Sequence, residues 1–247
     1  MVIRRGTTFN KGAIRAELEA NRDVPVACGQ RNSPAICWCM SATGESFPPQ
    51  GQPLSRSESI VRGAWGFGVT GVVAFSIWAL AGGWFGHHGG EGFLYAAIAF
   101  AFLGLAGLLL HPLISGPGSF RRFYLLFIPA FLAYSVIWSA AWFAAGFGWG
   151  EVLGSLVGSL AFVAVLGRFR GGIRPFLAAG LVLFVVHFST YWIGGQIAYR
   201  LMGPHGSDLL PGVDAGTRAL IAKLLWGLFY GTGFGAGLGN ALFVFRN

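Results

Sequence analysis

A run of twenty residues near the C-terminus, WGLFYGTGFGAGLGNALFVF (226–245), places the strongest constraint on how this chain can fold. It carries no charged residue, and it is long enough to cross a bilayer, because about 20 helical residues rising 1.5 Å each span the hydrocarbon layer. Glycine at every fourth position lets a second helix approach backbone to backbone, as helices do in membranes. We therefore predict that this last helix is the packing centre of a bundle. The glycines concerned are Gly227, Gly231, Gly235 and Gly239.

Five more apolar segments precede this one. With 54% hydrophobic and only 11% charged residues, the composition excludes an ordinary soluble domain. The predicted fold is an all-α integral membrane protein, with six transmembrane helices arranged as three αα-hairpins in residues 60–247 and the lipid bilayer as their partner. The segments cover roughly 62–85, 92–113, 122–146, 150–167, 174–195 and 218–245.

The net charge of +8 does not indicate nucleic-acid binding, because from residue 60 onward the basic residues lie at the ends of apolar segments and form no patch. One set of connections carries or adjoins five arginines (121, 122, 168, 170 and 174), whereas the four acidic residues of this part (91, 151, 208 and 214) lie on the other side. The positive-inside rule then predicts that both termini are cytoplasmic. In a bacterium the chain would lie in the cytoplasmic membrane.

Residues 1–59 are polar and show no sustained apolar period, which predicts a disordered extension without a secretory signal peptide. The alternative is that residues 1–39 are no part of the native protein, since Met40 opens a segment that could serve as the start. The three cysteines all lie in this extension and lack the spacing of a zinc or redox motif, so no cofactor is predicted.

Three short segments resemble one another: AFSIW, AYSVIW and HFSTYW, which contain Ser76, Ser135 and Ser189. Each step between the serines has the length of one helical hairpin, which predicts a threefold parallel repeat about an axis along the membrane normal. The alternative is that a chain rich in Ala, Phe, Ser and Trp produces such matches by composition alone.

The second, fourth and sixth segments are rich in small residues, including Gly150, Gly154 and Gly158 in the fourth. Small-residue faces pack closely. These three helices are therefore expected to form an inner group, with the Trp-bearing helices outside. Such a group would either seal a core or line a narrow path.

Polar side chains inside apolar segments are candidate functional residues, because hydrocarbon makes them costly. His187 could relay a proton or ligate a metal or haem, or it could simply bond to a neighbouring helix. Lys223 is expected to extend to the interface, and Asn240 to bond across to another helix. Ser76, Ser135 and Ser189 either surround a solute path or bond carbonyls of their own helices.

His87, His88 and Glu91 form a weak metal-site candidate in a short loop, where ordinary loop chemistry is the alternative. No P-loop, dinucleotide fingerprint, Gly-x-Ser-x-Gly serine or paired intramembrane carboxylate appears, so no enzyme is predicted.

Three functions remain open. The preferred one is a small passive channel or transporter for a neutral or weakly polar solute, because a repeated hairpin builds an axis and few charges lie within the spans. The second is a scaffold, subunit or assembly factor that holds partner helices, or further copies of itself, through glycine and Trp faces. The third is a metal- or haem-handling membrane protein.

Overall fold

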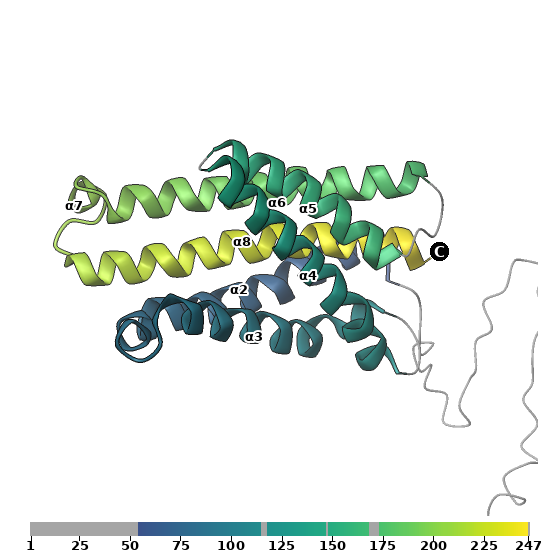
Figure 1. The fold of residues 1–247 in the computed structure, drawn as a ribbon, viewed down its shortest axis with the longest axis horizontal. Coiled ribbons are helices and arrows are strands. Elements are labelled where there is room, and N and C mark those ends of the chain that lie inside the picture. The colour runs from purple at the N-terminus through teal and green to yellow at the C-terminus, as the bar shows by residue number, and fades with distance from the viewer. Residues whose placement is uncertain (1–53, 115–117, 147, 168–172, 247) are drawn as a thin grey trace, which may run out of the picture. The chain divides into compact units, whose positions relative to one another are not determined.

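A computed structural model of the chain describes residues 54–114, 118–146, 148–167 and 173–246, and within these ranges it contains helices and no strand (Figure 1). Six helices are long and apolar enough to cross a membrane, which confirms the six predicted segments. The prediction for the N-terminal extension lies almost wholly outside the described residues. The elements are α2 (Arg56–His87), α3 (Gly90–Leu110), the 3₁₀ turn η1 (His111–Leu113), α4 (Ser119–Ala145), α5 (Trp149–Gly167), α6 (Ile173–Met202), α7 (Gly206–Leu209) and α8 (Ala215–Arg246).

Some helices begin or end at other residues than the predicted apolar segments do, because hydrogen bonds at the helix ends, and not hydropathy, set these limits. α2 begins at Arg56, ahead of the expected residue 62, because Ser55 and Glu58 form a capping box. The Glu58 backbone N–H donates to Ser55 Oγ at 3.2 Å, and the Ser55 N–H donates to the Glu58 carboxylate at 2.8 Å. The helical part therefore extends four residues into the predicted extension 1–59. α6 likewise continues beyond 195 to Met202.

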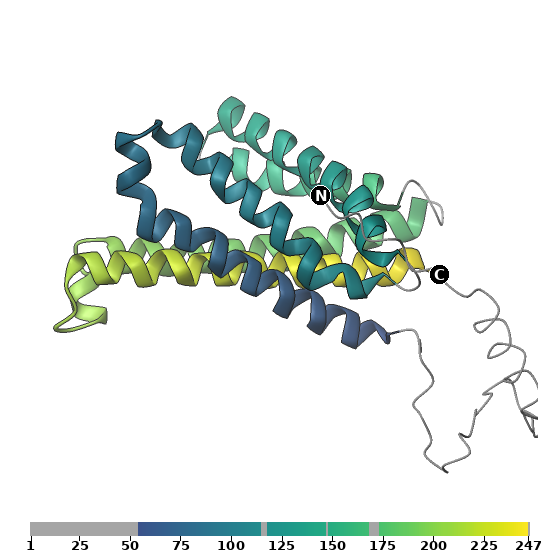
Figure 2. The same ribbon diagram turned by 90° about the horizontal axis from the view of Figure 1, so that it is seen from below.

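α8 lies between α2 and α6 and packs closely against both (Figures 1 and 2). Its fourfold-spaced glycines lie against the backbone of α2, which runs antiparallel to it: a Cβ added at Gly231 would lie 3.0 Å from Gly68 Cα, and one at Gly235 only 2.6 Å from Phe67 Cβ. Along this interface Gly239, Gly235, Gly231 and Gly227 lie opposite Ser59, Gly63, Phe67 and Gly71 in turn.

A second glycine face of α8 meets α6. Gly233 lies against Thr190, and a Cβ added at Gly237 would lie 2.8 Å from Leu183 Cα. α8 therefore approaches a helix at very short range on each side. Because α2 begins and α8 ends at the same end of the bundle, we name this the terminal end, and the end that holds the α2–α3, α4–α5 and α6–α8 connections the distal end.

The three antiparallel hairpins α2–α3, α4–α5 and α6–α8 are present, but their neighbours are not equivalent. α2 and α6 pack on α8, whereas α4 packs mainly on α5. This arrangement gives the threefold repeat no support. The predicted inner group of second, fourth and sixth helices is wrong, because α3 packs on α2 and α5 packs on α4 and α6, with little contact to α8.

Glycines also set the approach of α4 and α5. A Cβ added at Gly154 would lie 3.0 Å from Trp138 Cα, and one at Gly150 would lie 2.8 Å from Trp142 Cα. A Cβ added at Gly158 would lie 2.9 Å from the Tyr134 ring. The three glycines of α5 thus serve contacts inside the chain.

Phenylalanine rings fill the middle of the bundle around Phe234 of α8. Its ring centroid lies 5.0 Å from that of Phe67, 5.8 Å from that of Phe131 and 5.1 Å from that of Phe162. Phe102 of α3 stacks on Phe67 at 5.5 Å. All five rings are buried, so α2, α3, α4, α5 and α8 meet in one aromatic core.

Asp214 caps the first turn of α8. Its carboxylate accepts hydrogen bonds from the Thr217 hydroxyl at 2.6 Å and the Thr217 backbone N–H at 3.0 Å, and these hold its pKa below the usual value. A carboxyl with a depressed folded-state pKa stabilises the fold above its unfolded-state pKa, and this contribution is lost as pH falls through the folded-state value.

We therefore expect Asp214→Ala to speed amide hydrogen exchange in the first turn of α8 at about pH 6, where the carboxyl is ionised. The difference from wild type should shrink once the pH falls below about 4. Exchange measured by mass spectrometry and corrected for intrinsic rates tests this expectation, and a difference that does not change with pH would contradict it.

Candidate functional site

A hydrogen-bonded histidine–tyrosine pair lies in the middle of the bundle. His187 Nε2 of α6 and the Tyr134 hydroxyl of α4 are 2.8 Å apart, with the donor depending on the imidazole tautomer. Both side chains are buried. Because α6 runs on to Met202, His187 lies near the midpoint of the helix and deeper than the apolar segment 174–195 predicts. A polar pair at this depth is costly in hydrocarbon, which makes it the first candidate site.

Aromatic rings of α8 enclose the imidazole. Tyr230 and Phe234 present their rings edge-to-face to His187, with centroids 4.8 Å and 5.1 Å away. Tyr134 also contacts Phe234, at 5.4 Å. The pair is thus held by α4, α6 and α8 together and joins directly onto the aromatic core.

A second polar pair lies one turn nearer the distal end. The Tyr191 hydroxyl of α6 donates to the Glu151 carboxylate of α5 at 2.7 Å. Glu151 belongs to the first turn of α5. The carboxylate is half-buried, so an acidic group does enter one of the spans.

Four half-buried rings connect this pair to the other side of the bundle. We call them the aromatic belt: Trp78 of α2, Trp226 of α8, Tyr191 of α6 and Trp138 of α4, whose successive ring centroids lie 5.9, 5.9 and 6.4 Å apart. The ammonium of Lys223 lies 4.7 Å from the centroid of Trp78, a cation–π contact. The belt is therefore bordered by one cation and, through Tyr191, by one carboxylate.

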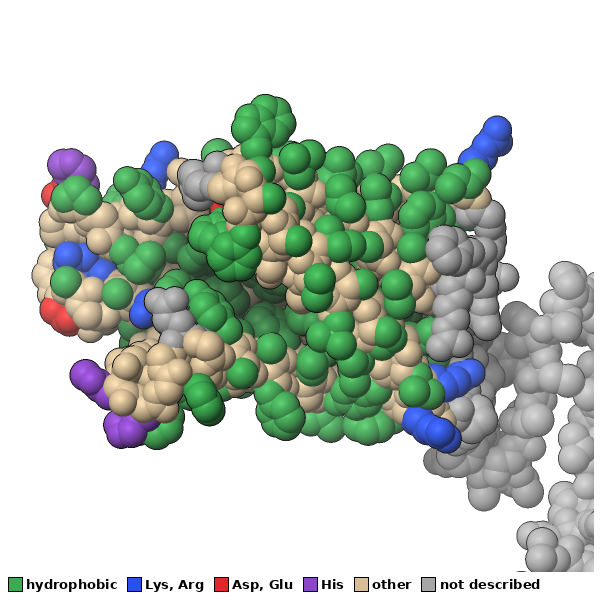
Figure 3. All heavy atoms as spheres, in the orientation of Figure 1, with side chains coloured by type: hydrophobic (Ala, Val, Ile, Leu, Met, Phe, Trp, Pro, Cys, Tyr) green, Lys and Arg blue, Asp and Glu red, His purple; other side chains and the backbone are tan. Residues whose placement is uncertain are grey.

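The surface is hollowed towards the distal end, between the α2–α3 hairpin and the α4–α5 hairpin (Figure 3). α3 and α4 meet near the terminal end, where the Tyr124 hydroxyl donates to the Gly104 carbonyl at 2.5 Å and Phe120 contacts His111. Beyond Phe102 and Phe131 the two helices diverge, and α4 runs obliquely across α8 (Figure 1). The two hairpins that border the hollow carry Trp78 on α2 and Trp138 on α4, the first and last rings of the belt.

The three repeat serines are not brought together. Ser76 donates to the Val73 carbonyl at 2.7 Å, and Ser135 to the Phe131 carbonyl at 2.8 Å, both within their own helices. Ser189 is exposed on α6. Among the described residues no hydrogen bond joins any two of them, so a serine ring around a solute path stays a prediction without support in the geometry.

The remaining candidates lie apart from this site. Asn240 is buried near the terminal end, where its Oδ1 accepts a hydrogen bond from Arg56 Nε of α2 at 2.9 Å. His87 and His88 are exposed at the distal end, and His88 Nδ1 lies 2.9 Å from the Trp84 carbonyl oxygen of its own helix. No group of three metal-ligating side chains occurs among the described residues, which exclude the Glu91 side chain.

Sequence reasoning selected His187 but missed its hydrogen-bond partner Tyr134 and the neighbouring ring of Tyr191. The spacing of His187 and Tyr191 was an available signal, since residues four apart share a helix face. Glu151 could also have been found, as the one acidic residue within the segment 150–167. The contact between His187 and Tyr134 had no such signal, because 53 residues separate them.

The six apolar helices identify the chain as a multi-pass membrane protein in contact with the lipid bilayer. Compared with protein families, with curated proteins and with solved structures, the chain matches none. Its function must therefore be inferred from the site itself.

Proposed function

We propose that this protein is a small passive carrier for a neutral or weakly polar solute, which enters through the distal hollow. The observation that supports this proposal most is the His187–Tyr134 pair, a buried polar contact at mid-bundle that an inert helical bundle would replace with apolar side chains. The belt, bordered by one ammonium and one carboxylate, carries no net charge and so suits an uncharged solute.

The aromatic core favours a carrier over an open channel. Phe67, Phe102, Phe131 and Phe234 pack against one another between the belt and the terminal end. A solute resting on the belt would have to displace these rings, so transfer requires the helices to move. Alternating exposure of a site near the bilayer midplane is how many small carriers work.

The scaffold hypothesis has less support. The glycines of α8 that would grip a partner helix are covered by α2 and α6, and those of α5 by α4. The metal hypothesis also lacks support. His87 and His88 are exposed, and His88 is bonded to its own helix, whereas the buried His187 bonds Tyr134.

Solute flux into liposomes that contain the purified protein tests the proposal. Uptake of glycerol, urea and ammonia, followed by osmotic swelling, should exceed that of empty liposomes for at least one solute. Tyr191→Phe should lower that uptake roughly tenfold, because it removes a charge-assisted hydrogen bond worth about 1.5–3 kcal/mol. Glu151→Gln should also lower the uptake, because its amide oxygen still accepts the hydrogen bond but the charge is lost. Tyr199→Phe is the matched control, since Tyr199 is on the same helix and exposed.

Equal uptake by wild type, Glu151→Gln and Tyr191→Phe would remove the belt from the transport path. Swelling no faster than that of empty liposomes for every solute would overturn the carrier proposal and leave the scaffold hypothesis as the better account.

A further inference from the structure

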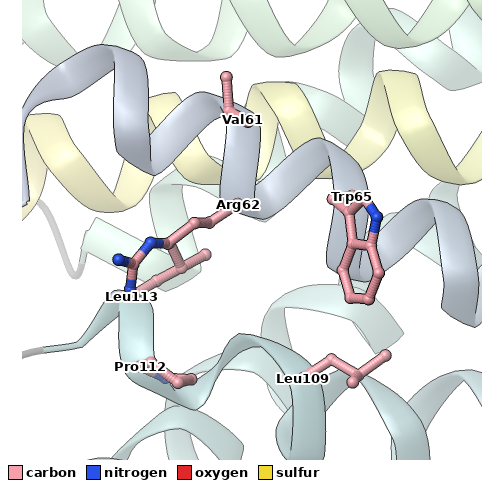
Figure 4. Close-up of a pocket in the computed structure, with 6 residues that line it drawn as sticks. All are labelled: Val61, Arg62, Trp65, Leu109, Pro112 and Leu113. Carbon is pink, nitrogen blue, oxygen red and sulfur yellow. The ribbon is translucent and has the colours of Figure 1, made fainter.

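A recess on the lipid-facing side of the bundle lies near the terminal end, between α2 and the α3–η1 junction. It has a volume of about 290 Å³, at the lower limit for small-molecule pockets. Figure 4 shows Arg62 and Trp65 extending from α2 towards η1 and α3, respectively. The residues that line it are Val61, Arg62, Trp65, Leu109, Pro112 and Leu113.

The lining combines one permanent cation with an apolar floor. Arg62 is exposed, and the other five side chains are apolar or, in Trp65, amphipathic. Glu58 lies one turn before Arg62, but its carboxylate accepts hydrogen bonds from Ser55. No described carboxylate lies within ion-pair distance of the Arg62 guanidinium, although Glu58 is close enough to interact with its charge.

The position of the recess indicates what fills it. Trp65 is 68% exposed, as an indole at the membrane–water boundary is, and the recess lies at the end of the bundle where α2, α4 and α6 begin with arginines. Basic pockets between helices on the cytoplasmic side attract anionic lipid headgroups. A soluble anion would leave the apolar floor of Leu109, Pro112 and Leu113 uncovered.

We propose that this recess, the lipid recess, binds one anionic glycerophospholipid from the membrane leaflet at the terminal end. The phosphate accepts hydrogen bonds from the Arg62 guanidinium, whose planar fork matches phosphate oxygens. One acyl chain lies over Leu109 and Leu113, beside the Trp65 indole. This site is independent of the carrier function, because it lies near the terminal end, whereas the belt lies on the distal side of mid-bundle.

Native mass spectrometry of the purified full chain, titrated with phosphatidylglycerol or phosphatidylcholine, tests the proposal. Phosphatidylglycerol should bind more tightly than phosphatidylcholine, and Arg62→Gln should weaken its binding about fivefold, the effect of one basic residue near an anionic surface. Arg174→Gln is the matched control, since Arg174 is exposed at the start of α6 and lies outside the recess. Unchanged thermal unfolding of both variants without lipid verifies that they fold.

Three outcomes would overturn the proposal. Equal affinity for the two lipids would show that charge does not select the occupant. An equal loss in Arg174→Gln would indicate a diffuse charge effect with no site. Binding of inorganic phosphate alone would indicate a soluble anion in place of a lipid, if the affinity for phosphatidylglycerol also does not depend on its acyl chains and does not change in Trp65→Ala.

Discussion

Gly231→Ala and Gly235→Ala are each expected to destabilise the folded protein by about 1–3 kcal/mol, and leucine at either position by more. The added Cβ would press on the backbone carbonyl of Phe67 or Gly63, and a backbone atom held in α2 has no rotamer by which to move away. α2 and α8 must then separate along their whole glycine interface. Thermal unfolding in detergent, followed by tryptophan fluorescence, should report the loss together with a lower yield of monodisperse protein.

Gly104→Ala is the matched control for these variants. Gly104 lies in the interior of α3, and a Cβ added there would meet no atom within 4 Å. Alanine favours a helix over glycine by about 1 kcal/mol, so this variant should be neutral or more stable than wild type. If Gly104→Ala and Gly231→Ala unfold at the same temperature, α8 is not the packing centre of the bundle.

Tyr134→Phe and His187→Phe are each expected to cost about 1 kcal/mol, the range found for hydrogen bonds between membrane helices. Either change leaves a buried polar atom without its partner, and that loss exceeds the net value of the bond itself. The double variant removes both polar atoms, so it should cost less than the sum of the two single changes. Thermal unfolding of the four proteins measures this coupling.

Tyr95→Phe controls for the loss of a tyrosine hydroxyl as such, since Tyr95 is 64% exposed on α3. It should unfold at the wild-type temperature. If the destabilisations of the two single variants add up strictly to that of the double variant, the hydrogen bond contributes nothing to stability. The pair would then no longer be supported as a polar site.

Helix glycines illustrate how a local pattern and a tertiary contact differ. The spacing of Gly227, Gly231, Gly235 and Gly239 predicts a face that another backbone can approach, and the sequence contains that information in full. It does not name the partner. α2 is rich in tryptophan and was expected on the outside, yet Gly63 and Gly71 give it one small face, and this face fits α8.

The candidate site shows the same division. Hydropathy marks His187 as unusual from the sequence alone, because a histidine in an apolar segment is costly. The contact of His187 with Tyr134 and that of Tyr191 with Glu151 each join two different helices. Spacing along the chain carries no information about such contacts.

The sequence by itself determined the number of spanning helices, the glycine faces and the buried histidine, because length, apolarity and spacing act within one segment. Only the tertiary structure decided three further features: the position of α8 between α2 and α6, the residue at which α2 begins, and the polar groups that meet at mid-bundle. These depend on which faces fit one another and on hydrogen bonds at helix ends, and both are properties of several segments together.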